Sequence, residues 1–161
     1  MDAKDLLAMF GATEFTFSQN ISDVTHEMSL IPSTEGGSSI NFLVGHALRS
    51  RQSVLELFGA EVVIRNEELP QYVKGEDFSP EKALPLDELT AMMHESFSRM
   101  KRAFVKASQD SLDEELSDPF LGQKVTRGRM AGLFSFHEAY HMGQVGLMRR
   151  LVGLGGKIQA K

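Results

Sequence analysis

Two histidines near the C-terminal end, His137 and His141, are spaced so that one metal ion could bind both. In an α-helix, residues that are four positions apart lie on the same face, one turn above the other. Each imidazole can offer one nitrogen to a metal ion at a distance of about 2.0–2.1 Å. Such a pair leaves the coordination of the metal incomplete, so at least one further ligand must come from elsewhere in the chain.

His137, Glu138 and His141 also spell the His-Glu-x-x-His pattern of zinc peptidases, in which the glutamate acts as a general base on a metal-bound water. These peptidases usually take their third ligand from a His, Glu or Asp downstream, and residues 142–161 contain none of these. Gln144 also stands where the extended pattern has a glycine. We therefore disfavour a peptidase and expect the third ligand upstream.

The composition is that of one acidic domain covering residues 1–161, with a formal net charge of −5 at pH 7. No basic block indicates binding to nucleic acid or to a membrane surface. The absence of cysteine excludes disulfides, cysteine-bound zinc and a cysteine nucleophile. Neither a signal peptide nor an apolar run of about 20 residues is present in the sequence. These features favour a cytoplasmic protein.

Four segments show the alternating three-four spacing of apolar residues that predicts the helices of a bundle. The predicted helices cover residues 3–28, then a segment from a cap at Ser38 or Ser39 to about residue 58, and residues 86–108 and 129–152. Gly59 is the expected stop of the second helix. Four helices with one apolar stripe each predict an all-α fold, a four-helix bundle.

Two long connections separate these helices, and the first contains three prolines, Pro70, Pro80 and Pro85. This connection, residues 60–85, is long enough to run back along the bundle, which would let the second and third helices lie parallel. A link of this length is often functional, but its length alone leaves open whether it covers a pocket. Residues 61–64 are compatible with a short extended piece. Residues 109–128 are predicted to form a polar loop that contains Asp118 and Pro119.

His46 is the best candidate for the third ligand, because it shares the phase of the apolar stripe of its helix. His26 and His94 do not, and we interpret them as solvated residues. Three imidazoles would leave one or two metal positions open for water or substrate, and they suit zinc, nickel, copper or iron. The alternative is that these histidines are hydrogen-bonded core residues, each of which would then need a buried partner.

Four further residues could belong to the site, and each has two interpretations. Glu138, our candidate catalytic residue, could reach a metal-bound water or orient a ligand, or else lie on the surface or at a subunit contact. Gln144 could line the pocket or satisfy a buried polar neighbour. Asn41 could touch the pocket or help its helix to start. Glu14 is either a buried acid near the site or a residue at the edge of its stripe.

Residues 37–46, 86–89 and 136–144 together resemble the corresponding segments of the DinB-like superfamily of damage-inducible and thiol-transferase proteins. The resemblance implies an up-down-down-up bundle and a site of three histidines, His46, His137 and His141, for a divalent metal such as zinc or nickel. It also implies a homodimer as the common state. Characterised relatives transfer or isomerise small-molecule substrates with a low-molecular-weight thiol such as bacillithiol, mycothiol or glutathione.

We favour a metal-dependent enzyme among the possible functions. Its metal would either favour the reactive thiolate of a thiol cosubstrate, as in a thiol S-transferase, or activate water, as in a hydrolase. The alternative is a non-catalytic metal-binding stress-response homodimer. A ferritin-like di-iron protein needs two Glu-x-x-His motifs and further carboxylates. Only Glu138 with His141 fits that motif, so we disfavour this class.

Overall fold

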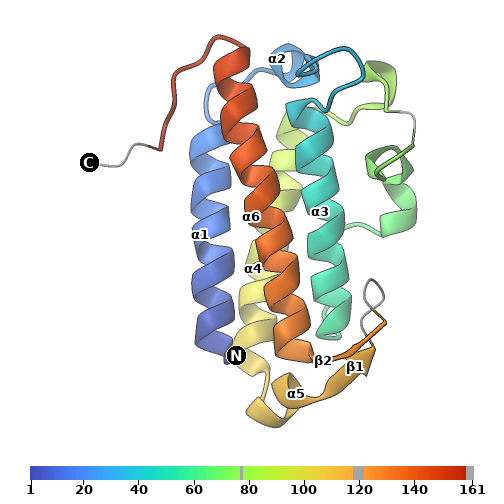
Figure 1. Cartoon of the computed structure of the whole chain (residues 1–161), viewed down its shortest axis with the longest axis vertical. Helices are drawn as coiled ribbons and strands as arrows, with labels where there is room; N and C mark the ends of the chain where they lie inside the picture. The colour runs from blue at the N-terminus through green and yellow to red at the C-terminus, as the bar shows by residue number, and fades with distance from the viewer. Residues whose placement is uncertain (77, 118–121, 159–161) are drawn as a thin grey trace.

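Four long helices packed side by side make up most of the computed structural model, which describes residues 1–76, 78–117 and 122–158 (Figure 1). The helices are α1 (Ala3–Ile21), α3 (Ile40–Leu57), α4 (Leu86–Lys106) and α6 (Arg127–Leu151). Both α1 and α3 pack against α6 and against α4. In chain order the four run up, down, down and up, which confirms the predicted topology (Figure 1).

Short elements occupy the connections between the long helices. They are the helices α2 (His26–Leu30) and α5 (Gln109–Asp113), the 3-10 helices η1 (Asn66–Glu68), η2 (Pro70–Tyr72) and η3 (Pro80–Lys82), and the strands β1 (Glu115–Ser117) and β2 (Lys124–Thr126). The two strands form an antiparallel pair at the lower end of the bundle (Figure 1).

Local hydrogen bonds fix where the long helices begin and end. The hydroxyl of Ser39 accepts from the backbone N–H of Phe42 at 3.2 Å and caps α3, as predicted from the sequence. After α3 the chain turns at Gly59, whose φ of 62° lies in the left-handed region that glycine tolerates best. Thr126 caps α6 in the same way, through the N–H of Arg129.

The prediction of one helix over residues 3–28 was wrong, because the chain breaks soon after Ile21. Asp23 adopts a positive φ of 64°, which no helix accommodates. The hydroxyl of Thr25 then caps a new short helix, α2, by accepting from the N–H of Met28. His26 therefore begins a helix, whereas a single helix over residues 3–28 would have put it near a helix end.

Two further segments differ from their predictions. Residues 109–128 are not simply a loop, because they contain α5, the strand pair and the start of α6; the predicted turn at Asp118 and Pro119 lies outside the described residues. Residues 61–64 form no strand. The N–H groups of Val63 and Ile64 donate instead to the side-chain oxygen of Gln52 on α3, at 2.8 and 3.4 Å.

The connection between α3 and α4 is tied to α3 through the buried ring of Tyr72. The Tyr72 hydroxyl donates to the side-chain oxygen of Asn41 at 2.9 Å and accepts from the N–H of Leu84 at 2.8 Å. The ring lies against Gly45, where a Cβ atom would meet it at 2.3 Å. A glycine is therefore required at position 45 for the connection to pack on the helix.

Replacing Gly45 with Ala is expected to lower the free energy of unfolding by about 1–3 kcal/mol, because the ring of Tyr72 must move away. Urea unfolding followed by circular dichroism measures this change. Gly11→Ala is the matched control, since a Cβ atom at Gly11 would meet nothing within 4 Å. That variant should gain about 0.5–1 kcal/mol, and equal effects of the two substitutions would contradict the packing argument.

Candidate metal centre

The structure brings together the three histidines that the sequence analysis selected. His46 on α3 and His137 and His141 on α6 each place a candidate ligand atom within 4.8 Å of the other two. The ring centroids are 4.4 Å apart for His137 and His141, and 5.2 and 4.9 Å from each of these to His46. The rings meet edge to face, so their nitrogens approach one another without the rings stacking.

Each histidine is held through its Nδ1 atom. That of His46 lies 2.9 Å from the carbonyl oxygen of Tyr72, and that of His141 lies 2.7 Å from the side-chain oxygen of Gln144. The Nδ1 atom of His137 lies 3.2 Å from the hydroxyl of Ser50. Carbonyl oxygens only accept hydrogen bonds, so His46 and His141 carry their protons on Nδ1 and leave Nε2 free to bind a metal.

The Nε2 atoms of His137 and His141 are only 3.0 Å apart. The lone pair of His141 Nε2 points into this space, because the proton of that ring is on Nδ1. A second lone pair at this distance would repel it, so either a proton or a metal ion must lie between the two nitrogens. The arrangement therefore fits a metal ion, with the three Nε2 atoms as ligands.

Both histidines of α6 favour the neutral form that metal binding requires. The pKa of His141 is lowered to about 4, chiefly by burial and also by the neighbouring His137 and His46, against the hydrogen bond that His141 donates to Gln144. Burial also lowers the pKa of His137, and His46 adds to this effect. At neutral pH these imidazoles are therefore available as ligands without first losing a proton.

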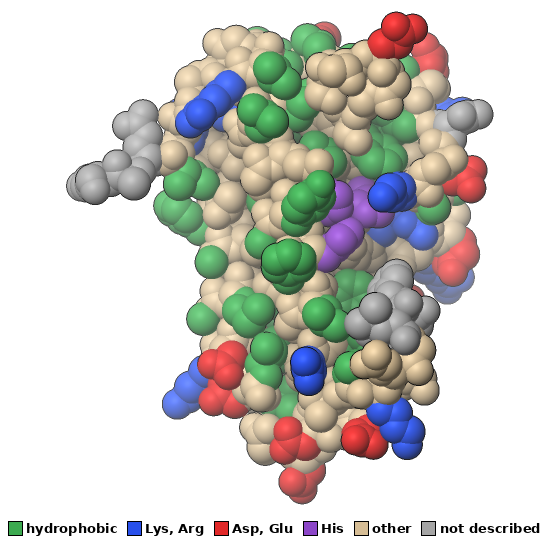
Figure 2. Space-filling view, in the orientation of Figure 1, with side chains coloured by type: hydrophobic (Ala, Val, Ile, Leu, Met, Phe, Trp, Pro, Cys, Tyr) green, Lys and Arg blue, Asp and Glu red, His purple; other side chains and the backbone are tan. Residues whose placement is uncertain are grey.

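A cavity of about 450 Å³ opens beside two of the histidines. Its lining is His46, Arg49, Ser50, Ser53, Asn66, Lys74, Met130, Leu133, Phe134 and His137. In the surface view the imidazoles are accessible, with basic side chains on one side and hydrophobic ones on the other (Figure 2). Asn66 and Lys74 belong to the connection between α3 and α4, so this connection forms part of the wall.

Of the two predicted pocket residues, one contacts a histidine and the other does not. Gln144 accepts from His141 and so orients a candidate ligand. Asn41 is fully buried, donates to the carbonyl oxygen of Leu84 and accepts from Tyr72. Asn41 does not line the cavity. It anchors the connection between α3 and α4, and the backbone carbonyl of Tyr72 in this connection accepts a hydrogen bond from His46.

Glu138 lies in the core, on another side of α6 from the two histidines. Its two oxygens accept from the guanidinium of Arg51, at 2.9 and 2.6 Å, and Oε1 also accepts from Thr13 at 2.5 Å. A carboxylate held in this way is not free to take a proton from a metal-bound water. The geometry does not fit the catalytic role that we predicted for Glu138, and it makes this residue a structural partner of Arg51.

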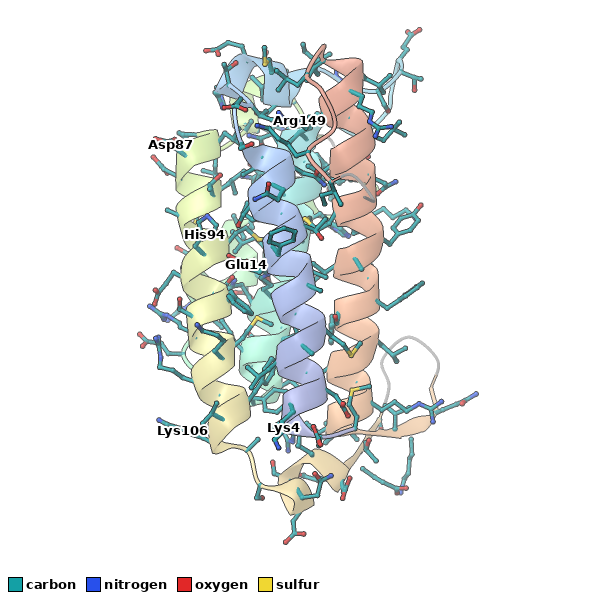
Figure 3. The ribbon with its side chains drawn as sticks, turned by 90° about the vertical axis from the view of Figure 1, so that its left-hand side faces the viewer. Lys4, Glu14, Asp87, His94, Lys106 and Arg149 are labelled. Atoms are coloured by element: carbon teal, nitrogen blue, oxygen red, sulfur yellow. The ribbon has the colours of Figure 1, made fainter. Side chains whose placement is uncertain are left out.

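Arg51 connects Glu138 with Glu14, the residue whose role the sequence left open. Its Nη1 atom donates to Glu14 at 2.8 Å and to the carbonyl oxygen of Met93 at 2.5 Å. Burial alone would lower the pKa of Arg51, but Glu138 and Glu14 outweigh this effect and raise it. Glu14 also meets His94 at the surface between α1 and α4 (Figure 3). Glu14 is therefore part of this charged network and does not join the three histidines.

Two residues that hold the histidines, Tyr72 and Ser50, were missed from the sequence, and so was Arg51, the partner of Glu138. Tyr72 lies in a connection without periodicity, although Gly45, just before His46, was an available signal, since a glycine inside a helix often has a packing reason. Ser50 lies one turn after His46, a spacing that puts both residues on the same face of their helix, but a serine there indicates no particular role. Arg51 gave no signal, because a single arginine in a helix is usually solvated.

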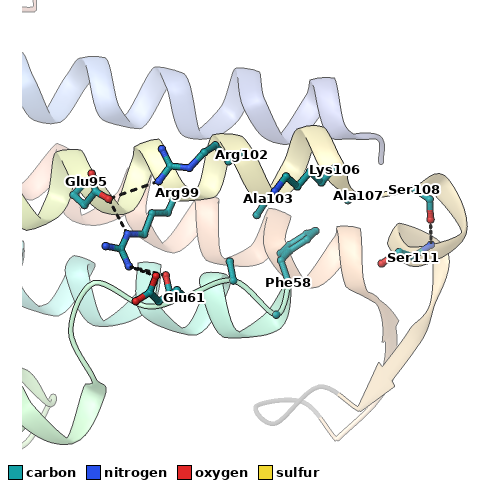
Figure 4. Close-up of a pocket in the computed structure, with 12 residues that line it drawn as sticks. Phe58, Glu61, Glu95, Arg99, Arg102, Ala103, Lys106, Ala107, Ser108 and Ser111 are labelled. Atoms are coloured by element: carbon teal, nitrogen blue, oxygen red, sulfur yellow. Dashed lines mark hydrogen bonds and ion pairs between the residues drawn. The ribbon is translucent and has the colours of Figure 1, made fainter.

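A second pocket, of about 560 Å³, lies along α4 and does not include the three histidines (Figure 4). Its charged residues largely compensate one another. Arg99 pairs with Glu95 at 2.8 Å and with Glu61 at 3.6 Å, and Arg102 approaches Glu95 at 3.7 Å. This pocket therefore offers less uncompensated charge to a ligand than the cavity beside the histidines.

Within the ranges 1–76, 78–117 and 122–158, no helix combines the length and the apolar character that crossing a bilayer requires.

The DinB superfamily is the family whose sequence model matches this chain, over residues 15–145. Among proteins of curated function, none matches it.

Several solved structures share the fold at low sequence identity. A conserved protein from Enterococcus faecalis is 17% identical with a TM-score of 0.73, and the match covers 94% of this chain and 98% of that one. YfiT from Bacillus subtilis is 16% identical with a TM-score of 0.72, at coverages of 95% and 89%. It is described as a probable metal-dependent hydrolase with an unusual four-helix bundle topology. A DinB-like protein from Bacillus cereus is 11% identical with a TM-score of 0.74, at coverages of 98% and 97%.

Proposed function

The chain belongs to the DinB superfamily, and we propose that it is a metal-dependent enzyme in which His46, His137 and His141 hold one divalent cation. The observation that carries this proposal is the orientation of the three rings, whose Nδ1 atoms are engaged while their remaining nitrogens converge. An accessible cavity beside them gives a small molecule access to the cation. Zinc and nickel are the metals that we expect.

We favour thiol S-transfer as the reaction. When bound, the cation supplies a Lewis acid that polarises a substrate, activates water or stabilises a thiolate. Hydrolysis usually also needs a general base, and the described lining of the cavity contains no Asp or Glu. A thiol cosubstrate needs no such base if its thiolate form is stabilised. The hydrolase alternative draws support from the description of YfiT.

Metal reconstitution followed by two assays tests the proposal. Untagged protein would be stripped with a chelator and reloaded with Zn²⁺ or Ni²⁺, and metal content would be measured by mass spectrometry. Turnover of electrophiles and esters would then be compared with and without glutathione or bacillithiol. Metal-dependent turnover that requires the thiol supports transfer, and turnover without it supports hydrolysis. A stoichiometric metal with no turnover in either assay would favour the non-catalytic alternative.

We further propose that the chain forms a homodimer through an apolar stripe on the outer face of α6. Hydrophobic side chains gather along this helix (Figure 2). The exposed members of the stripe are Leu133, Phe136, Tyr140, Leu147 and Leu151. Their three-four spacing is that of a helix packed against a partner helix. Gly143 lies within the stripe with open space where a Cβ atom would be, which allows close approach of a second copy.

Replacing Phe136, which is 72% exposed, with Asp is expected to convert the dimer into a monomer without unfolding it. A charge within an apolar interface is costly to desolvate. Analytical ultracentrifugation measures the mass directly. Val105→Asp, at an exposed hydrophobic residue on α4, is the matched control and should leave the dimer intact. A wild-type protein that sediments as a monomer would contradict the proposal.

A further inference from the structure

The cavity beside the histidines carries an excess of positive charge that points to a class of substrate. Its described lining contains two cations, Arg49 and Lys74, and no Asp or Glu. The whole chain has a net charge of −5, so this lining differs from the rest of the protein. A concave surface of one sign attracts ligands of the opposite sign, and a divalent cation at the histidines would strengthen the effect.

Lys74 provides one of the two positive charges of this wall. It follows Tyr72 in the connection, is exposed, and forms no ion pair with a described residue. It lines the cavity together with His46 and His137. A ligand bound at the histidines is therefore within the reach of this long side chain.

Arg49 provides a fixed charge. Its Nη1 atom donates to the carbonyl oxygens of Asn66 and Leu69, the latter at 2.9 Å, and this holds the guanidinium in place. Its other N–H groups form no hydrogen bond with a described residue, although Glu67 exerts some electrostatic influence. A pre-organised guanidinium with free donors suits a carboxylate, because little side-chain freedom is lost on binding.

Asn66 adds a neutral polar contact to the same wall. Its side-chain nitrogen donates to the hydroxyl of Ser53 at 3.3 Å, while its side-chain oxygen is buried without any hydrogen-bond partner. If the amide were flipped, the unpaired group would be the nitrogen instead. In both cases one amide group of the cavity wall lacks a partner, and this costs free energy until a ligand supplies one.

We propose that the substrate of this site is a small carboxylate that also carries a neutral hydrogen-bonding group and a short apolar part. Its carboxylate lies between Lys74 and Arg49, its polar group meets Asn66, and its apolar part packs on the hydrophobic residues of α6. These are Met130, Leu133 and Phe134. A cavity of about 450 Å³ suits a ligand of metabolite size. This inference rests on the proposed metal centre, which places the reacting end of the ligand.

Two thiols of equal size test the inference, 3-mercaptopropanoate and its neutral amide, because both can bind a metal through sulfur. Protein loaded with Co²⁺ would report their binding through the visible absorption of the metal. In the wild type, the carboxylate is expected to bind about tenfold more tightly than the amide. In Lys74→Gln, this preference for the carboxylate should fall to about threefold or less. Lys106→Gln, in the pocket of Figure 4, is the control and should retain the tenfold preference.

The outcomes separate this inference from the proposed function. Equal affinities for the two thiols in cobalt-loaded wild type would overturn the inference and leave the metal centre in place. An unchanged preference in Lys74→Gln would also overturn it, because the carboxylate would then not lie at Lys74. The absence of a ligand-bound cobalt spectrum would instead overturn the metal centre, and the inference with it.

Discussion

Replacing His46 with Ala is expected to reduce the affinity for Zn²⁺ or Ni²⁺ by at least about a hundredfold. His46 is the single ligand from α3, and the variant would leave only the two histidines of α6. Loss of a residue that merely orients a ligand typically costs 10–100-fold in metal affinity, so loss of a ligand should exceed about that range. Metal content by mass spectrometry on untagged protein, followed by titration with a competing chelator, measures the change.

His94→Ala is the matched control for His46→Ala. His94 is a histidine on a neighbouring helix, but it pairs with Glu14 and lies outside the cluster of three. This variant should retain the wild-type metal content. Circular dichroism should show that both variants remain helical, because His46 is only half-buried. Full metal binding by folded His46→Ala would contradict the three-histidine centre.

The parts of the fold that the sequence predicted are those governed by local periodicity. The apolar spacing located four long helices because each must bury one stripe. The same spacing led to the error at the first helix, since Val24 and Met28 continue the apolar stripe beyond Ile21. The positive φ of Asp23 breaks the helix there, and the apolar pattern carries no information about it.

Helical periodicity also made the three histidines predictable. Their positions on the apolar stripes of two helices indicate that they point toward the interior of the bundle. Their supporting contacts were not predictable, since these join distant segments. The carbonyl of Tyr72 reaches His46 across 26 positions, and the backbone of any residue could in principle have done so. Ser50 and His137 are 87 positions apart. Such pairings depend on how the helices are rotated and aligned, and no single sequence pattern records this.

The charged network in the core shows most clearly what the helical pattern could not reveal. Arg51 on α3 contacts one residue from each of the other long helices: Glu14 on α1, Glu138 on α6, and Ser96 on α4, whose hydroxyl lies 3.5 Å from the Nη1 atom of Arg51. Along α3, Arg51 lies between residues of two clusters of buried hydrophobic side chains, one cluster before it and one after it. A buried charge is tolerated only where partners from other helices meet it. Because the pairing of Glu138 with Arg51 joins two distant segments, the helical pattern could not show that this carboxylate is already engaged.

Replacing Glu138 with Ala is expected to lower the free energy of unfolding by about 3–5 kcal/mol. Glu138 is 1% exposed and Arg51 is 0% exposed, so the variant would leave the guanidinium buried with Glu14 as its one remaining carboxylate. Urea unfolding at pH 7 measures the loss. Glu95→Ala is the control, because it breaks the ion pairs of a half-exposed glutamate with Arg99 and Arg102. That change should cost about 1 kcal/mol or less.

A double variant separates the cost of an unpaired charge from the loss of packing. Arg51→Met combined with Glu138→Leu removes both charges and retains most of the side-chain volume, so it should be far more stable than Glu138→Ala alone. A buried ion pair replaced by apolar residues is often neutral in stability, since desolvating the two charges offsets their attraction. If the double variant were as unstable as Glu138→Ala, the loss of stability would come from lost packing and not from an unpaired charge. If it were stable but bound metal more weakly, the ion pair would align α3 and α6 so that His46 meets His137 and His141.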